Sequence, residues 1–435
     1  MKPILLEPTD VLFFRDGRPM TGSLAGHGAA WPLPHVISHA FHAALHRADL
    51  SGVHAHRRGR SGSYEDTRDR KFGSLTTVGP FPVCTHGETH TWFFPRPLDA
   101  AADSPILHPV AGSKDASSLP APLKYTVGSA VPPNKAELCR WWSEGAWNAY
   151  LGTGQRDAHA ARSFFKSDSD FAATEHNCGI GLSAETGTVE EGRFYSASYL
   201  RLKGGWKLGV AATAPDKDYR DAQGDSDLVS ALIHGEGGHI LVGGQQRVCS
   251  AMRDDSVAQR LPLPLGKSDG FHTANDRHLV KWVLLTPAIF PQINDHSGGS
   301  LPSWIDQATG EVMLLDGPGE NAARRRRLPP GKPIAATLVA AVTGKSLPVT
   351  GWALPNGTDR EQGGAKSTHL AVPAGSIYYF ECADAASAAT LANALNWHGT
   401  SPGTDILNRR STLMGEKGFG LGVCGTWSFH PCGGL

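Results

Sequence analysis

The sequence predicts an α+β protein made of two ferredoxin-like units that pack together, with long loop and helical insertions. Its 435 residues are too many for one ordinary hydrophobic core. Near the amino terminus, an apolar run leads through a glycine-rich link and Pro34 into a helical pattern, as at the start of a β-α-β-β-α-β unit. Near the carboxyl terminus, the alanine-rich stretch 385–396 follows a capping Asp384 and predicts the last helix of a second unit.

The boundary between the two units is expected in the polar segment 214–224. We therefore predict an amino-terminal domain over residues 1–213 and a carboxyl-terminal domain over 225–435. The 51 glycines and 30 prolines imply many loops and turns.

The composition limits the possible partners and compartments. Lysine plus arginine and aspartate plus glutamate both number 41, so any basic surface must be local. The seven cysteines contain no Cys-x-x-Cys pair, which favours reduced cytoplasmic thiols over a zinc ribbon or a disulfide framework. No signal peptide and no run of 18 apolar residues is evident, so we expect a cytoplasmic protein.

The stretch 6–20 is the most informative segment. The run 11–14 is apolar and predicts a central strand buried on both faces. Arg15, Asp16 and Arg18 follow it directly, where a rigid strand could aim two guanidinium groups. The alternative is a solvated turn that holds an Arg–Asp pair.

A helix is expected over residues 35–50, with Ile37 and Phe41 on its apolar side. The histidines of its opposite side form a stripe: His35, His39, His42 and His46. Histidines four residues apart can chelate a metal ion. We favour a polar face toward solvent, RNA or a partner, because no further ligand type accompanies them.

Two segments carry clustered cations. Residues 54–73 form a flexible basic stretch, and 324–327 are four consecutive arginines. Each is either a solvated loop or a contact for phosphates or a partner.

Further elements are expected along the chain. Residues 78–99 read as two short strands ended by prolines, the first at a sheet edge. Residues 137–152 predict an aromatic-rich helix. Strands 198–202 and 206–212 are expected to pair around the turn 203–205, and 281–290 to form a buried strand that ends in a proline turn.

In the carboxyl-terminal stretch 415–427, glycines at 418, 420 and 422 alternate with apolar residues. In a strand, one face would then be bare backbone, which permits close approach of another chain or a phosphodiester. The letters Gly420-x-Gly-x-x-Gly425 match a dinucleotide fingerprint, but no room remains for the helix and strand that must follow.

Several of these blocks carry a family resemblance. The segment Leu-Glu-Pro-Thr-Asp-Val-Leu-Phe-Phe-Arg-Asp-Gly-Arg-Pro (6–19) resembles the opening of the third Cmr subunit family of type III-B CRISPR effector complexes, within the RAMP superfamily. Trp-Pro-Leu-Pro (31–34), the Thr-Gly element at 186–195 and the glycine-rich 415–427 are similar to further family elements. Leu-Val-Gly-Gly-Gln-Gln-Arg (241–247) departs from the family's Leu-Gly-Gly-Glu-x-Arg at Val242 and Gln245.

The resemblance implies two ferredoxin-like RAMP modules without catalytic residues, metal or cofactor. It implies a subunit for antiviral defence that caps the effector complex and grips the 5′ tag of the CRISPR RNA. Its expected partners are the large polymerase-cyclase subunit, the first backbone RAMP subunit and, through the complex, other Cmr subunits and target RNA. The residues that we expect to contact RNA are Arg15, Arg18, Arg57, Arg58, Arg60, Arg68, Arg70, Lys71, Arg247, Lys366, Lys417, Gly418, Phe419, Gly420 and Gly422.

Two alternatives remain open at this point. The many histidines suit a RAMP endoribonuclease that processes precursor CRISPR RNA with a histidine as general acid or base. A purely architectural subunit would contact only proteins. No Gly-x-Ser-x-Gly elbow, phosphate-binding loop or Gly-Gly-Asp-Asp motif occurs in the sequence.

Overall fold

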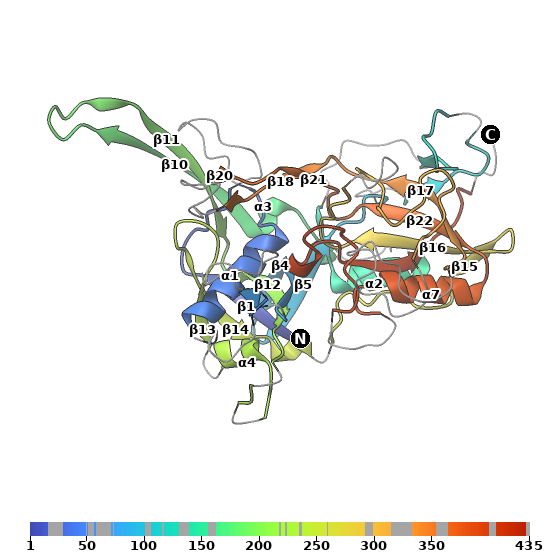
Figure 1. Ribbon diagram of the computed structural model, residues 1–435, viewed down its shortest axis with the longest axis horizontal. Coiled ribbons are helices and arrows are strands. Elements are labelled where there is room, and N and C mark those ends of the chain that lie inside the picture. Colours follow the sequence, from blue (N-terminus) through green and yellow to red (C-terminus); the bar gives the residue numbers. More distant parts are fainter. Residues whose placement is uncertain are drawn as a thin grey trace.

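The computed structural model describes residues 1–15, 29–48, 50, 56–57, 71–72, 74–100, 106–114, 117–129, 139–154, 162–216, 219–221, 224–234, 237–258, 260–291, 299–314, 333–353, 364–399 and 406–431. Two antiparallel sheets form its centre (Figure 1). Helices cover the outer faces of both sheets, and a long hairpin projects from one end of the molecule (Figure 1). None of the helices in the described ranges is long and apolar enough to cross a membrane.

The first sheet places the amino-terminal strand among partners that come from distant parts of the chain. In order across the sheet, its strands are β13 (Gly238–Leu241), β14 (Val248–Arg253), β1 (Lys2–Pro8), β12 (Trp206–Thr213), β4 (Thr76–His86), β5 (Thr89–Pro95), β8 (Trp141–Ser143) and β9 (Phe165–Lys166). Helices α1 (Pro34–Arg47) and α4 (Leu228–Leu232) share a buried cluster with one face of β1 and β12.

The second sheet is built from the carboxyl-terminal half. Strands β15 (His272–Ala274), β16 (Arg277–Leu284), β22 (Ile377–Cys382) and β17 (Ala336–Val342) follow one another, and β23 (Gly422–Thr426) pairs with β16. Helix α7 (Ala385–Leu395) covers its outer face.

Smaller elements complete the described chain. The projecting hairpin is β10 (Ala172–Leu182) and β11 (Val189–Leu202). Two-stranded ladders are formed by β2 (His56–Arg57) with β3 (Lys71–Phe72), β6 (His108–Pro109) with β7 (Val127–Gly128), β18 (Leu347–Val349) with β21 (His369–Ala371), and β19 (Trp352–Ala353) with β20 (Gly364–Ala365). The short helices are α2 (Glu144–Thr153), α3 (Asp168–Phe171), α5 (Asp255–Ala258), η3 (Arg162–Phe164) and η4 (Gly415–Lys417).

The two sheets share a hydrophobic core between their inner faces. Side chains alternate along β16, so Leu279 and Val283 join this shared core while Val280 and Trp282 join the cluster under α7. Strand β1 alternates in the same way, with Leu5 in the shared core. Central strands of both sheets are therefore buried on both faces, which explains their continuous apolar sequences.

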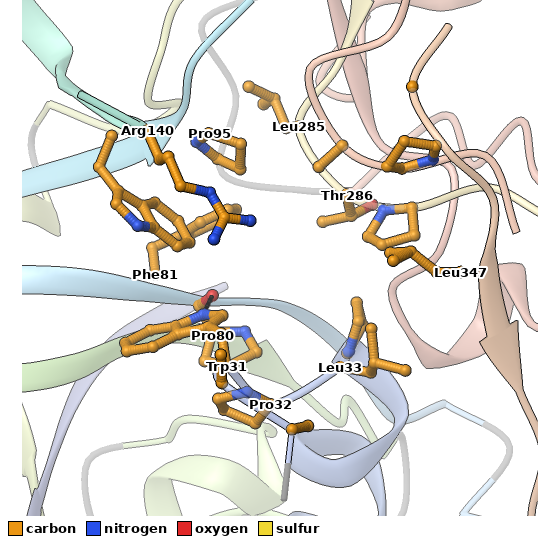
Figure 2. Close-up of a pocket in the computed structure, with 18 of the residues that line it drawn as sticks. Trp31, Pro32, Leu33, Pro80, Phe81, Pro95, Arg140, Leu285, Thr286 and Leu347 are labelled. Atoms are coloured by element: carbon orange, nitrogen blue, oxygen red, sulfur yellow. Dashed lines mark hydrogen bonds between the residues drawn. The ribbon is translucent and has the colours of Figure 1, made fainter. Parts of the chain in front are cut away.

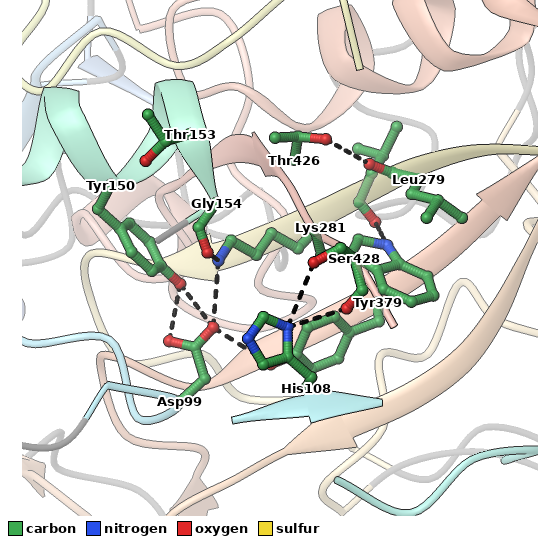
Figure 3. A network of polar contacts seen from close by, with 12 residues as sticks. Asp99, His108, Tyr150, Thr153, Gly154, Leu279, Lys281, Tyr379, Thr426 and Ser428 are labelled. Carbon is green, nitrogen blue, oxygen red and sulfur yellow. Dashed lines mark hydrogen bonds and ion pairs between the residues drawn. The ribbon is translucent and has the colours of Figure 1, made fainter. Parts of the chain in front are cut away.

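One buried polar network lies in this shared core (Figure 3). The carboxylate of Asp99, which follows β5, lies 3.1 Å from Nζ of Lys281 on β16, and both side chains are 0% exposed. Tyr150 of α2 and Tyr379 of β22 donate their hydroxyls to the same carboxylate at 2.8 and 3.2 Å. Asp99 thus joins the first sheet to two elements of the second sheet and to the helix between them.

Several local predictions are confirmed. Helix α1 has Pro34 in its first turn, as predicted, although it ends at Arg47 rather than near residue 50. Helix α7 has Asp384 as its amino-terminal cap, with the carboxylate 2.7 Å from the Ser387 amide. Strand β16 is buried and leads into the turn at Pro287 as expected.

The position of the central strand was predicted wrongly. The central strand is β1, and residues 11–14 follow it as an extended segment with one bridge, between Leu12 and Leu200. Val11, Leu12 and Phe14 are buried. The run is apolar because it packs against other parts of the chain, with Val11 against β11, and not because it is a hydrogen-bonded strand of the sheet.

Three further predictions about strands and helices differ from the structure. Strand β4 lies inside the sheet, because a bulge opposite Gly209 and Ala211 accommodates Pro80. Strand β12 pairs with β1 and β4, whereas β11 pairs with β10. Residues 141–143 form β8, so the helix predicted over 137–152 begins only at Glu144, where Ser143 caps it.

The chain passes from the first sheet to the second later than residues 214–224, where we expected the domain boundary. Strands β13 and β14 lie beyond residues 214–224, yet β14 pairs with β1 from Ile4 to Pro8. The chain therefore leaves the first sheet only after Arg253.

Glycines of β23 and the preceding turn are required by close packing inside the chain. A Cβ on Gly422 would lie 2.3 Å from the indole nitrogen of Trp282, and one on Gly420 would lie 2.0 Å from the Ser411 amide nitrogen. We expect Gly422→Val to lower the free energy of unfolding by about 3 kcal/mol, because the second sheet must open to admit the side chain. Urea denaturation of the purified chain measures this loss.

The matched control is Gly152→Ala in α2, where a Cβ meets nothing within 4 Å. This change should raise the free energy of unfolding by about 0.5–1 kcal/mol, since alanine is the better helix former. An unchanged unfolding midpoint for Gly422→Val would show that the space beside β23 is not reserved by packing.

Candidate nucleic-acid interface

The segment that ends at Arg15 packs against the glycine-rich turn between β13 and β14. The Gly244 amide donates to the Phe13 carbonyl oxygen at 2.9 Å. Gly243 has φ +80°, and a Cβ there would lie 2.5 Å from the same carbonyl oxygen. The two glycines are needed because this turn closes directly on residues 13 and 14. Two blocks that the sequence separates widely are thereby brought together.

Arg247 is the centre of this contact. Its guanidinium lies 5.2 Å from the centre of the Tyr199 ring, donates to Gln245 Oε1 at 3.2 Å and lies 3.5 Å from the Asp10 carboxylate. Tyr199 also donates its hydroxyl to Gln245 Oε1, at 3.0 Å. These contacts fix the plane of the guanidinium. We call Asp10, Phe13, Arg15, Tyr199, Gln245 and Arg247 the Arg247 site.

The backbone of this turn is held in an unusual conformation. Gln245 and Gln246 have φ of 57° and 52°, in the left-handed region that residues other than Gly, Asn, Asp and His rarely adopt. Such strain persists where the surroundings enforce it and is concentrated at functional sites.

The charges of the Arg247 site are unevenly neutralised. Arg201 pairs with both Glu175 and Asp10, and its hydrogen bond holds the pKa of Asp10 below its usual range. Arg247 shares Asp10 only at 3.5 Å, and its Nε has no acceptor among the described residues. Arg15 is exposed and forms no ion pair with a described residue. Arg15 is thus open to an anion, and the Arg247 side chain is 27% exposed.

A second group of expected residues lies along α1. Lys366 and Lys417 both act electrostatically on His35 and His39. The His35 ring is half-buried and stacks on Phe419 with ring centres 5.9 Å apart. Burial, and then the two lysines, lower the pKa of His35 to about 4. The imidazole is thus neutral at physiological pH beside two cationic side chains.

The glycine-rich element does not present a bare face. Gly418, Gly420 and Gly422 are buried, and Phe419 is 0% exposed. The close approach that these glycines allow is made by the chain itself, as when Gly418 closes on the Thr77 carbonyl oxygen of β4. Among the four residues, none offers its side chain or an open backbone face to RNA in this conformation.

The other expected contacts are less defined. Arg57 and Lys71 are paired backbone positions in the β2–β3 ladder. Asp16, Arg18, Arg58, Arg60, Arg68, Arg70 and the run 324–327 lie outside the described residues.

Sequence reasoning missed two features of this region. Tyr199 supplies the ring under Arg247, and no local pattern indicates that β11 passes beneath the β13–β14 turn. The hairpin β10–β11 was also missed, although the turn Ser-Ala-Glu-Thr-Gly-Thr at 183–188 is a hairpin signal. Its side chains Ile180, Leu182 and Val189 are 51–57% exposed.

Among the described residues, His90 with Asp254 and Ser256 is a Ser-His-Asp grouping, but it does not have triad geometry. Asp254 and Ser256 both approach Nδ1 of His90, at 2.8 and 3.4 Å. A general base needs one ring nitrogen for the nucleophile and the other for the carboxylate. The Trp92 indole also donates to Asp254, so this cluster supports the β5–α5 contact. Within the described ranges, no group of three His, Cys, Asp or Glu side chains is placed to hold a metal ion. In the histidine stripe, the ring of His35 packs edge to face on that of His39, and the ring of His42 on that of His46.

These features can be compared with known proteins. A family model described as CRISPR-associated protein (Cas_Cmr3) matches residues 4–427, and the chain belongs to this family. It is similar to a chain in a cryo-EM structure of the type III-B Cmr-beta bound to cognate target RNA, with 14% identity, coverage of 87% of this chain and 86% of that one, and a TM-score of 0.39. A chain of a Csm3-Csm4 subcomplex from the type III-A CRISPR-Cas interference complex gives 11% identity, coverage of 87% and 92%, and a TM-score of 0.33. No curated protein sequence matches the chain.

The environment of His35 makes stability depend on pH. Its pKa is about 4 in the folded chain and near 6.5 when unfolded, so between these values the unfolded chain binds the extra proton. We expect the free energy of unfolding to fall as pH decreases from 6.5 to 4, by up to about 1.4 kcal/mol per pH unit from this residue. Urea denaturation at several pH values, with His35→Gln as control, isolates the effect. An equally steep loss in His35→Gln would assign the dependence to other groups.

Proposed function

We propose that the chain is a non-catalytic CRISPR RNA-binding subunit of a type III-B effector complex, acting in antiviral defence in the cytoplasm. In this proposal it grips the 5′ tag of the guide RNA and docks the large polymerase-cyclase subunit onto the first backbone subunit. Membership of the CRISPR-associated family supports the setting. The observation that carries the RNA contact is the packing of Arg247 on Tyr199, at the turn that closes on Phe13 two residues before Arg15.

We further infer that both sheets are ferredoxin-like modules. In the first, β1, α1, β4, β12, α4 and β14 follow one another along the chain, and the strands lie in the order β14-β1-β12-β4. In the second, β16, β17, β22, α7 and β23 give the equivalent order β23-β16-β22-β17. All of these pairings are antiparallel. This is the β-α-β-β-α-β arrangement, except that the described residues between β16 and β17 form no helix.

The chemistry of the Arg247 site suits an RNA backbone and an unstacked base. With equal numbers of acidic and basic residues, affinity must come from a few placed cations. A guanidinium offers planar donors to a phosphate, and that of Arg247 lies over the Tyr199 ring with its side chain 27% exposed. Phe13 packs at 5.4 Å from Tyr199 and is half-buried, so an aromatic surface adjoins the cations.

The projecting hairpin supports membership of a larger assembly. Two strands with apolar side chains exposed toward the tip gain little stability in water by themselves. Ile180, Leu182 and Val189 are each more than half exposed. A neighbouring subunit or RNA that covers them would provide the missing burial.

The competing function is an endoribonuclease that cuts precursor CRISPR RNA. A histidine would then serve as general acid and base. Incubation of the purified chain with precursor RNA tests this directly. Specific cleavage that is lost on a single His→Ala change would replace the proposal of a non-catalytic subunit.

The double change Arg15→Ala, Arg247→Ala tests the proposed grip. We expect it to weaken binding of 5′-tag RNA at least tenfold, which corresponds to about 1.4 kcal/mol. The dependence of affinity on salt should also become shallower, because fewer phosphate contacts release fewer counterions. Filter-binding titrations at several salt concentrations measure both quantities.

The matched control is Arg253→Ala on β14, which removes an arginine that pairs with Asp255 outside the Arg247 site. It should leave RNA affinity within twofold of the parent chain. Equal affinities for the double variant and the parent, with a lower melting temperature for the double variant, would show that the two arginines only brace the turn.

A further inference from the structure

A cavity of about 640 Å³ opens where the two sheets adjoin, outside the Arg247 site (Figure 2). Its walls come from the loop before α1, the bulge of β4, the segment after β5 and the turns that follow β16 and β17. Prolines and aromatic rings dominate these walls, among them Trp31, Pro80, Phe81, Pro95, Trp141 and Pro373. The volume is in the range of sites for small organic ligands.

The aromatic walls are held in place by hydrogen bonds. The Trp31 indole donates to the Pro80 carbonyl oxygen at 3.0 Å, and the Trp141 indole donates to Asp168 at 2.7 Å. The two indole rings also pack edge to face, with centres 5.3 Å apart. The flat surfaces are therefore preorganised, which lowers the entropic cost of binding a planar group.

The cavity carries an excess of positive charge. Three cations, Arg96, Arg140 and Lys345, line it together with a single carboxylate, Asp168. Arg140 uses one nitrogen for Asp168 at 2.6 Å, and Figure 2 shows its guanidinium directed into the cavity. No described residue accepts a hydrogen bond from the other N–H groups of Arg140.

Arg96 is the least compensated of these cations. Burial lowers its pKa, so water solvates the guanidinium poorly. The carboxylate that acts most strongly on it, Asp99, is already paired with Lys281. The Arg96 guanidinium has no hydrogen-bond or ion-pair partner in the described part of the chain. A half-buried charge in this state is stabilised by a bound anion.

We propose that this cavity binds a single nucleotide, with the base between the proline and tryptophan walls and the phosphate on Arg96, Arg140 and Lys345. Planar rings stack on aromatic and proline faces, and guanidiniums bind phosphate through paired donors. A purely apolar ligand would leave Arg96 uncompensated, and a cation would be repelled. The cavity and the Arg247 site have no residue in common. A negative result for mononucleotide binding in the cavity can therefore be told apart from a negative result for RNA binding at the Arg247 site.

Quenching of tryptophan fluorescence in the full-length chain tests the proposal. AMP, GMP, CMP and UMP are titrated separately, with adenosine and inorganic phosphate for comparison. We expect saturable quenching by at least one mononucleotide, and at least tenfold weaker binding of adenosine and phosphate. Trp31→Phe should reduce the signal change, because Trp31 forms a wall of the cavity.

Substitutions at the cationic side chains test whether the fluorescence quenching reports binding at the cavity. Arg96→Met should weaken mononucleotide binding at least tenfold, and Lys345→Ala, at an exposed position, should also weaken it. Arg253→Met, outside the cavity, is the matched control. Displacement of the mononucleotide by single-stranded RNA identifies the occupant as a nucleotide of an RNA chain, and its retention identifies a free nucleotide.

Three results would overturn the proposal. The first is no saturable quenching by any of the four mononucleotides at millimolar concentration. The second is parental affinity in both Arg96→Met and Lys345→Ala. The third is binding of an oligoglutamate peptide where mononucleotides do not bind, which would assign the cavity to an acidic segment of a protein.

Discussion

The buried ion pair between Asp99 and Lys281 determines how the two halves of this protein meet. Neither side chain is exposed, and the Tyr150 and Tyr379 hydroxyls complete the hydrogen bonds of the carboxylate. Removing one member of such a pair leaves an uncompensated buried charge, at a cost of about 3–5 kcal/mol. Because its members come from both sheets and from α2, the network favours one relative placement of the sheets over others that would bury similar apolar area.

The two binding regions depend on that placement in different ways. The cavity between the sheets exists only when the turns after β16 and β17 face the loop before α1, and Arg96 lies three residues before Asp99. The Arg247 site lies beside the β13–β14 edge of the first sheet, where the β13–β14 turn closes on Phe13. It therefore depends on β14 returning to pair with β1 rather than on the second sheet.

Sequence signals close to a helix end predicted where helices begin. They did not predict which strands pair with each other. Pro34 and Asp384 marked the starts of α1 and α7 correctly, since capping depends on adjacent residues. The apolar run 11–14 was assigned to a central strand because burial and ladder pairing give the same sequence pattern. The pairing of β12 with β1 and β4 is set by contacts between residues distant in sequence. The glycine pattern at 418–422 indicated close approach of some backbone, but not that other parts of this same chain make that approach. Arg15 and Arg247 were expected to contact RNA, but nothing in the sequence placed Arg247 on Tyr199.

We propose that the Arg247 site holds the 5′ tag of a guide RNA. The most direct test is photocrosslinking of the assembled effector complex, with a photoactivatable nucleotide at each position of the tag in turn, followed by mass spectrometry of the crosslinked peptides. If the Arg247 site holds the tag, the crosslinks will lie in peptides that contain Phe13 and Tyr199, the two aromatic side chains packed together at Arg247. Crosslinks from every tag position to other subunits alone would contradict it.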